Sequence, residues 1–421
     1  MDSMPGMSGM APAPNAPKGG SDMAGMDMGS ASGGMTGALG AYPMTREASG
    51  TSWQPDAAHH DGLHLMRGPW TFMAHALLNG VYDDQHGPRG GRESFGAGMV
   101  MLAARRDFAN ADSLNFRAML TPEPFMGPSG YPLLLASGET ANRTTPLIDR
   151  QHPHDLFMEL STSYAHRLSA RDSLFLYAGL PGEPAFGPPA FMHRMSIMDS
   201  PEAPISHHWL DSTHVTFGVV TAGWVHGDFK LEASRFKGRE PDQNRWNIEA
   251  PRLDSTALRV SWNPGARWAL QASWADQHSP EQLSPDENER RWSASAIYTA
   301  PVGAAGWWST TAAWGRRQST GGPALDAVIL ESAVHPTDPW TIFARAESTR
   351  TDELTPGLLH GPVQTVSKAS IGAIHDWRVA PHLKVGLGGL YAVNVVPGAL
   401  AASYGGDTPT GAMAFVRLKV D

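Results

Sequence analysis

The chain has 421 residues and no cysteine, so disulfides and thiolate-bound metals are excluded. It also lacks any run of about eighteen apolar residues, the length that a membrane-spanning helix needs. If the chain crosses a membrane, it must do so as a closed β-barrel, because lipid offers the backbone no other hydrogen-bond partners. The net charge of -9 and the pI near 6.0 argue against a nucleic-acid partner.

A secretory signal is also missing at the start of the sequence. Met1 is followed by neither the basic region nor the apolar region of an export signal. We therefore expect that the numbering begins after an export signal has been removed.

Three zones follow one another along the chain. Residues 1–52 consist mostly of Met, Gly, Ser, Ala and Pro, with almost no large aliphatic residues. Such a segment cannot bury enough apolar surface to offset its ordering entropy, so we predict a disordered tail. Residues 53–68 form a short connector that contains several histidines. Residues 69–421 share one pattern of apolar and polar residues throughout, which predicts a single folded domain.

That pattern has a period of two. Trp268, Leu270, Ala272 and Trp274, for example, alternate with small or polar residues. A strand with lipid on one side and water on the other needs this alternation. We count about sixteen such strands. They lie near residues 70–82, 94–105, 112–121, 155–168, 172–180, 213–225, 228–237, 254–263, 266–276, 290–300, 306–316, 324–334, 339–349, 364–377, 382–395 and 409–420.

The connections between these strands alternate between short and long, as periplasmic turns and outer loops do in transmembrane barrels. We therefore predict an all-β fold: a transmembrane antiparallel up-and-down barrel of about sixteen strands in a bacterial outer membrane, with the tail in the periplasm. A soluble propeller or sandwich is the alternative, because its strands alternate too. The expected partners are outer-membrane lipid and the barrel-assembly machinery, although the chain ends in Asp421 rather than in the usual aromatic residue.

Methionine is concentrated in the tail, where nine of the twenty methionines lie within the first 44 residues. Thioether sulfur is a soft ligand that selects Cu(I), and it needs no deprotonation to bind. The tail is therefore predicted to bind copper. Its candidate ligands are Met1, Met4, Met7, Met10, Met23, Met26 and Met28. The alternatives are a linker with incidental methionines and an adaptable apolar contact surface.

A methionine-rich N-terminal segment followed by a β-barrel resembles the outer-membrane copper-resistance B proteins of Gram-negative bacteria. The resemblance covers the composition of the tail and the overall layout, and no residue motif along the barrel. It implies a role in copper tolerance, with a periplasmic copper oxidase or an efflux component as a partner.

Two long loops contain further candidate metal ligands. The first has His152 and His154, whose imidazoles can project to one side of an extended segment. The second repeats the three-residue methionine spacing of the tail and continues into a pair of histidines, with His214 shortly after. Its candidates are Met192, His193, Met195, Met198, His207 and His208. The alternative is that either loop supports the barrel through hydrogen bonds, or forms an inward plug.

A catalytic interpretation is weaker. Ser206, His207 or His208, and Asp211 are the residue types of an acyl-transfer triad, but no nucleophile elbow surrounds them. We therefore expect no enzyme and assign no catalytic residue. The leading hypothesis is a barrel that binds or transports a soft metal ion, most simply copper. The alternative is a general diffusion porin for small solutes with an incidental tail, and the oligomeric state stays open.

Overall fold

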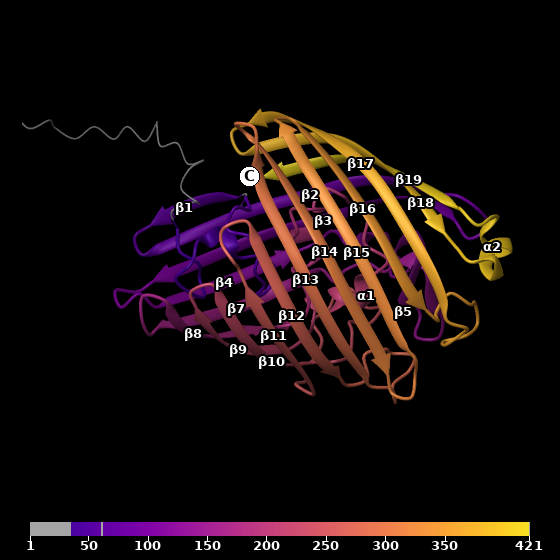
Figure 1. Cartoon of the computed structure of the whole chain (residues 1–421), viewed down its shortest axis with the longest axis horizontal. Helices are drawn as coiled ribbons and strands as arrows, with labels where there is room; N and C mark the ends of the chain where they lie inside the picture. The colour runs from indigo at the N-terminus through magenta and orange to yellow at the C-terminus, as the bar shows by residue number, and fades with distance from the viewer. Residues whose placement is uncertain (1–34, 60–61, 421) are drawn as a thin grey trace, which may run out of the picture.

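The computed structural model describes residues 35–59 and 62–420. The predicted tail ligands from Met1 to Met28 lie outside the described residues. Sixteen antiparallel strands form a closed barrel (Figure 1). They are β2 (Trp70–Gln85), β3 (Gly91–Asp107), β4 (Ser113–Leu120), β7 (Phe157–Arg167), β8 (Asp172–Gly179), β9 (Val219–His226), β10 (Phe229–Phe236), β11 (Ser255–Trp262), β12 (Trp268–Gln277), β13 (Glu289–Val302), β14 (Gly306–Ser319), β15 (Ala324–Thr337), β16 (Trp340–Thr351), β17 (Gln364–Ala380), β18 (Leu383–Val395) and β19 (Thr410–Val420).

The ring closes where β19 pairs with β2, from Gly411 opposite Gln85 to Val420 opposite Ala76. A short strand, β1 (Leu63–Arg67), pairs with the remaining part of β2 from Ala74 to Trp70. β1 therefore continues the ladder beyond the point where β19 ends, and the edge of β2 is paired along most of its length. This short strand falls within the connector predicted from the sequence.

The outer surface of the barrel is apolar. In β16 the burial alternates residue by residue, so that Ile342 is 43% exposed and the next residue, Phe343, is 3% exposed. Exposed aromatic side chains lie beside the short turns. They are Trp224, Phe229, Trp262, Trp268, Trp308, Trp340 and Trp377. Aromatic girdles of this kind mark the interfaces of transmembrane barrels, so the fold predicted from the sequence is confirmed.

The long connections carry the other elements. These are η4 (Glu123–Met126), β5 (Tyr131–Thr140), β6 (Pro146–Gln151), η5 (Phe191–His193), α1 (His207–Leu210), η6 (Ser212–His214) and α2 (Gly398–Tyr404), while η3 (Met44–Arg46) precedes the barrel. α2 lies at the opposite end of the barrel from the C-terminus (Figure 1). Among the described residues, no helix has the length and apolar character needed to span a bilayer. We call the end with the short turns the inner end and the other the outer end.

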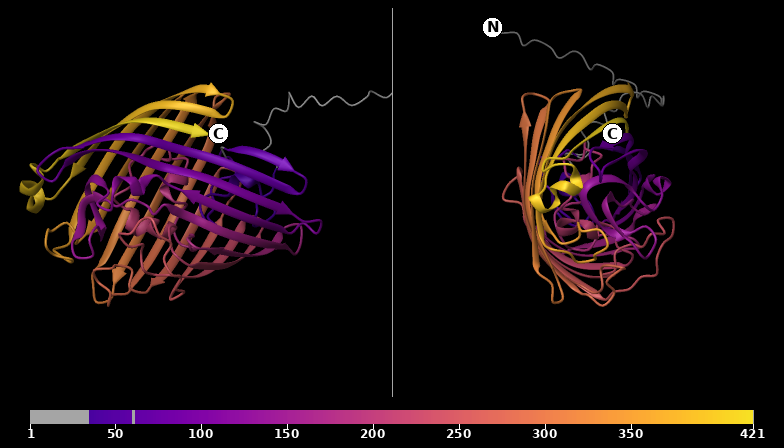
Figure 2. Two further views of the ribbon diagram at one scale, coloured as in Figure 1. Left: turned by 180° about the vertical axis from the view of Figure 1, so that it is seen from behind. Right: turned by 90° about the vertical axis from the view of Figure 1, so that its right-hand side faces the viewer.

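Two segments fill the inside of the barrel, and both are seen between its walls in Figure 2. One is the inner segment, residues 35–59. The other is the plug loop, residues 180–218, which joins β8 to β9. Phe186, Arg194 and Leu210 of the plug loop are each 2% exposed or less. The β5–β6 hairpin packs beside them, and its Leu133 and Phe191 of the plug loop belong to one apolar cluster.

The structure differs from the predicted boundary of the disordered tail. Residues 35–52 are folded against the barrel wall, and Tyr42 and Arg46 are 4% and 3% exposed. Arg46 pairs with Asp56 at 2.6 Å and with Asp228 of the β9–β10 turn at 3.1 Å. The segment is ordered because the barrel wall supplies contacts, such as the ion pair of Asp228 with Arg46, that the segment cannot form within itself.

The strand predicted over residues 213–225 begins only at Val219. Residues 213–218 belong to the plug loop instead, where Thr216 pairs with Gly182 in an isolated antiparallel bridge. The β5–β6 hairpin also lies within a stretch predicted to be an irregular loop. Residues 213–218 and the first six residues of β5 are buried without interruption, so they lack the two-faced alternation that identifies wall strands.

The apolar exterior supports a stability prediction. Leu330 is 55% exposed in the middle of β15, so Leu330→Arg places a charge in hydrocarbon and is expected to destabilise the barrel by about 2–4 kcal/mol. Urea unfolding in phospholipid vesicles measures the change. Leu358→Arg, in an exposed outer loop, is the matched control and should leave the unfolding free energy nearly unchanged. Equal effects of the two substitutions would contradict a lipid-facing Leu330.

Candidate functional site

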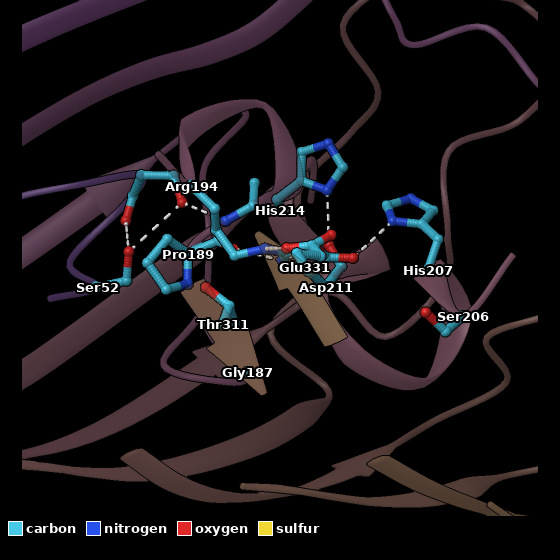
Figure 3. Close-up of polar contacts among 12 residues, drawn as sticks. Ser52, Gly187, Pro189, Arg194, Ser206, His207, Asp211, His214, Thr311 and Glu331 are labelled. Carbon is cyan, nitrogen blue, oxygen red and sulfur yellow. Dashed lines mark hydrogen bonds and ion pairs between the residues drawn. The ribbon is translucent and has the colours of Figure 1, made fainter. Parts of the chain in front are cut away.

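The plug loop is anchored by a buried arginine. Arg194 Nε donates to Glu331 Oε2 of β15 at 2.7 Å, and its Nη1 donates to Asp211 Oδ2 at 2.6 Å (Figure 3). All three side chains are 2% exposed or less. Against the effect of burial, Arg194 and His207 lower the pKa of Asp211. Asp211 therefore stays ionised inside the lumen and can hold other groups in place.

Further contacts tie the plug loop to strands around the barrel. They are Ser196 Oγ with Thr311 Oγ1 of β14 at 2.7 Å, Ser206 Oγ with Glu347 Oε2 of β16 at 2.9 Å, Glu202 Oε1 with Lys368 Nζ of β17 at 2.5 Å, and Asp199 with Arg417 of β19. The hydroxyl of Ser206 donates to the carboxylate of Glu347, and this hydrogen bond holds the plug loop to the barrel wall. The plug loop thus spans the lumen from wall to wall.

Three histidines meet beside this anchor and form what we call the histidine cluster: His154, His207 and His214. Their ligand atoms all lie within 4.8 Å of one another, and all three side chains are buried. His154 comes from the segment before β7, whereas the other two belong to the plug loop. Figure 3 shows the rings of His207 and His214 directed toward Asp211.

Two rings of the histidine cluster, those of His207 and His214, favour the neutral form. Burial lowers the pKa of His207, and it lowers the pKa of His214 well below its usual range, with the neighbouring imidazoles adding to the effect. A neutral imidazole keeps one nitrogen lone pair and can act as a metal ligand at neutral pH. The cluster therefore presents three potential nitrogen donors in a dry environment.

A second group lies next to the first. Ligand atoms of His208, Glu240 and Glu281 also fall within 4.8 Å of one another. His208 Nδ1 lies 3.4 Å from Glu240 Oε2, whereas His208 Nε2 and Glu281 Oε1 are buried and have no hydrogen-bond partner among the described residues. Although burial opposes it, His208 lowers the pKa of Glu240, so this carboxylate is ionised. His152 lies between the two groups, with its ring centroid 6.0 Å from that of His207 and 5.7 Å from that of His208.

A cavity rich in methionine and histidine opens at the inner end of the barrel. Its volume is about 360 Å³. We call it the Met/His cavity, and its sulfur and imidazole lining consists of Met35, Met44, Met66, Met73, Met99, Met101, Met195, Met198, His59, His64, His75 and His193. These residues come from the inner segment, from β1 to β3 and from the plug loop. Five parts of the chain thus contribute thioethers or imidazoles to the lining of one space.

A buried cluster of methionine side chains packs beside this cavity. Met99, Met101, Met119 and Met158 form one buried cluster that also includes Val215, the residue next to His214. Met192 packs against the same cluster. This buried cluster therefore includes both Met99 and Met101, which line the cavity, and Val215, which is adjacent in sequence to His214.

The structure brings most of the described sequence-predicted residues together. His152, His154, His207 and His208 meet in the outer half of the lumen, and His193, Met195 and Met198 line the Met/His cavity. Met192 packs against the buried methionine cluster. The predicted mixed site of Met192 with its neighbours is thus divided, because Met192 is not part of the cavity lining that the other three share.

The candidate ligands predicted from the sequence did not include several residues that the structure places at these sites. His214, Glu240 and Glu281 join the histidine groups, and the methionines of β2 and β3 join the cavity. A signal for the latter exists in the sequence: Met99 and Met101 are two residues apart, so they share the inward face of one strand. No comparable local signal links Glu240 or Glu281 to a histidine that is far away in the sequence.

No known protein family matches this chain, and no curated protein matches its sequence. In fold, the chain is similar to OmpF of Salmonella typhi, in a complex with daunomycin, with a TM-score of 0.53, 8% identity, and coverage of 85% of this chain and 100% of that chain. It also aligns with OmpTdeltaL8, an outer-membrane protein of Vibrio cholerae (TM-score 0.48, 8% identity, 83% of this chain and 99% of that chain). The anion-selective porin from Comamonas acidovorans gives a TM-score of 0.46, 11% identity and coverage of 83% and 99%. The likeness to OmpF establishes a porin-like barrel fold, and we draw nothing from the two lower scores.

Proposed function

We propose that this chain is an outer-membrane barrel that binds and transports a soft metal ion of the Cu(I) class. The observation that carries the proposal is the Met/His cavity, in which thioethers and imidazoles are the main donors. Soft thioether ligands select Cu(I) over the common hard cations. Neither thiolates nor a preformed cluster of carboxylates is needed, because a monovalent soft ion binds well to neutral sulfur donors.

The position of the cavity suggests a direction for the ion. Short turns of transmembrane barrels face the periplasm, so the cavity opens on the periplasmic side. Met35, the first described residue, lines the cavity and continues directly from the methionine-rich tail. We propose that the tail captures the ion in the periplasm and passes it to the cavity. A periplasmic copper oxidase or efflux component is the partner that such a role requires.

Titration of the full chain with Cu(I) tests this proposal. Met195→Leu combined with Met198→Leu removes two cavity thioethers at nearly constant volume, and it is expected to weaken Cu(I) binding about tenfold or more, or about 1.4 kcal/mol. Met413→Leu, a buried methionine in β19 outside the cavity, is the matched control and should bind as the unaltered protein does. Removal of residues 1–34 should lower the number of Cu(I) ions bound. Unchanged titrations for both the double variant and the truncated chain would refute the proposal.

The second candidate is a general diffusion porin, and the fold similarity to OmpF favours it. A barrel of this size leaves an aqueous channel unless loops fill it, and the plug loop occupies that space in the described structure. Planar-bilayer recording separates the two candidates. A steady open channel that ignores added Cu(I) would favour the porin, whereas a closed barrel that binds Cu(I) would favour the metal-handling role.

A further inference from the structure

We propose that His154, His207 and His214 form a binding site for a divalent transition-metal ion such as Zn²⁺, separate in position and chemistry from the Met/His cavity. The inference goes beyond the proposed handling of Cu(I), because it concerns a different class of ion. It also assigns a role to the plug loop, since the three ligands join that loop to the segment before β7.

The hydrogen bonds of the three rings fix their orientation. His214 Nδ1 lies 2.6 Å from the carbonyl oxygen of Asp211, and a carbonyl oxygen can only accept, so this nitrogen carries the proton. His207 Nδ1 lies 2.7 Å from Asp211 Oδ1, and His154 Nδ1 lies 2.7 Å from Glu123 Oε2. Each ring therefore carries a proton on Nδ1, which leaves its Nε2 atom as the nitrogen that can bind an ion.

This arrangement is the one found around metal-bound histidines. A ligating imidazole almost always donates its other N–H to a carboxylate or a backbone carbonyl, which fixes the tautomer and raises the basicity of the ligand atom. Here all three rings have such a partner. A purely structural histidine needs no such coincidence, because it can donate and accept through either nitrogen.

The contact between two of the rings needs a positive charge. His154 Nε2 and His214 Nε2 are 2.9 Å apart, and because both Nδ1 atoms already donate elsewhere, either a proton or a metal ion must bridge these two nitrogens. Two imidazoles bound to one ion through bonds of about 2.0–2.1 Å lie up to about 4 Å apart. No two ligand atoms of the cluster are more than 4.8 Å apart, so closing around an ion requires a movement of less than about 1 Å.

The donor set identifies the class of ion. Three imidazole nitrogens without thiolate suit Zn²⁺ and Cu²⁺, and the three-histidine set leaves a fourth position open on a tetrahedral ion. The ring centroid of Phe191 lies 5.7 Å from that of His207 and 6.2 Å from that of His154, so an apolar face borders the site. None of these three histidines lines the Met/His cavity, which is why the two sites should differ in selectivity.

Cobalt provides the test, because Co²⁺ occupies three-histidine sites and its visible absorption reports the ligands. We expect the full chain, stripped with a chelator and refilled, to take up about one Co²⁺ per chain at this site, and Zn²⁺ to displace it. His214→Ala should abolish the absorption band. Glu123→Gln keeps the size of the carboxylate that orients His154 and should weaken binding by about 10- to 100-fold.

Two controls make the outcome decisive. His226→Ala removes a half-exposed wall histidine that is paired with Asp172 in a similar manner, and it should leave the Co²⁺ band unchanged. The Met195→Leu and Met198→Leu double variant should lose Cu(I) affinity while keeping the Co²⁺ band. Circular dichroism confirms that each barrel is folded. Absence of a Co²⁺ band in the unaltered chain, or its survival in His214→Ala, would overturn the site and leave a pair of rings that shares a proton.

Discussion

Removal of the plug loop is expected to turn a closed barrel into an open channel. The deletion replaces residues 183–215 with a short Gly-Ser linker between Gly182 and Thr216, which already face each other in an antiparallel bridge. The wall strands keep all of their pairings, whereas the buried side chains that cross the lumen are lost. Because a sixteen-stranded barrel encloses a water-filled space once it is unblocked, single-channel conductance in planar bilayers should appear only in the deletion variant.

A deletion in an outer loop is the matched control for this experiment. Residues 356–360 are exposed in the connection between β16 and β17, so replacing them with two glycines removes chain without touching the lumen. That variant should stay closed. A plug-deleted barrel that folds and inserts but conducts no current would show that the inner segment and the β5–β6 hairpin alone are enough to close the lumen.

Arg194→Met is expected to be the most damaging single substitution in the plug loop. Its side chain is 1% exposed and pairs with both Asp211 and Glu331, so its removal leaves Asp211 without a guanidinium partner and Glu331 with Arg345 alone. Breaking a buried ion pair in this way costs about 3–5 kcal/mol. Urea unfolding in vesicles should report this loss, and the Co²⁺ band should weaken as well, because Asp211 orients His207 and His214.

The exposed pair of Arg316 with Asp326 provides the comparison. Its two side chains are 42% and 26% exposed, so water screens the interaction and Arg316→Met should change the unfolding free energy little. An Arg194→Met barrel as stable as the Arg316→Met barrel would mean that the plug loop is held mainly by its apolar contacts. In that case Phe191 and Ile197, which pack in the main apolar cluster, would be the next residues to replace.

The wall of the barrel was predictable because its cause is local. A strand between lipid and lumen alternates at every second residue, and all sixteen predicted strands overlap strands of the structure. The errors fall on chain inside the lumen. Residues 35–52 have the composition of a disordered segment but are ordered by contacts such as Arg46 with Asp228, whose position on the barrel wall no local pattern reveals.

The candidate ligands were predictable in kind more than in arrangement. Methionine and histidine in the plug loop could be recognised from the softness of the thioether and the usual role of imidazole in metal sites. The division of these candidate ligands into two separate sites could not be predicted from the sequence. His154 and His214 are 60 residues apart in the sequence, and their Nε2 atoms come within 2.9 Å only because the plug loop turns back beside the start of β7.

The sequence by itself therefore determined the barrel, its strand number and its inner and outer ends, because these follow from short-range alternation and from the lengths of adjacent loops. Only the tertiary structure decided that the lumen is filled and that the ligands separate into a Met/His cavity and a histidine cluster. The physical reason is that the interior of the closed barrel brings together loops and terminal segments that are far apart in the sequence. Contacts across a lumen depend on how the whole ring closes, and no window of neighbouring residues contains that information.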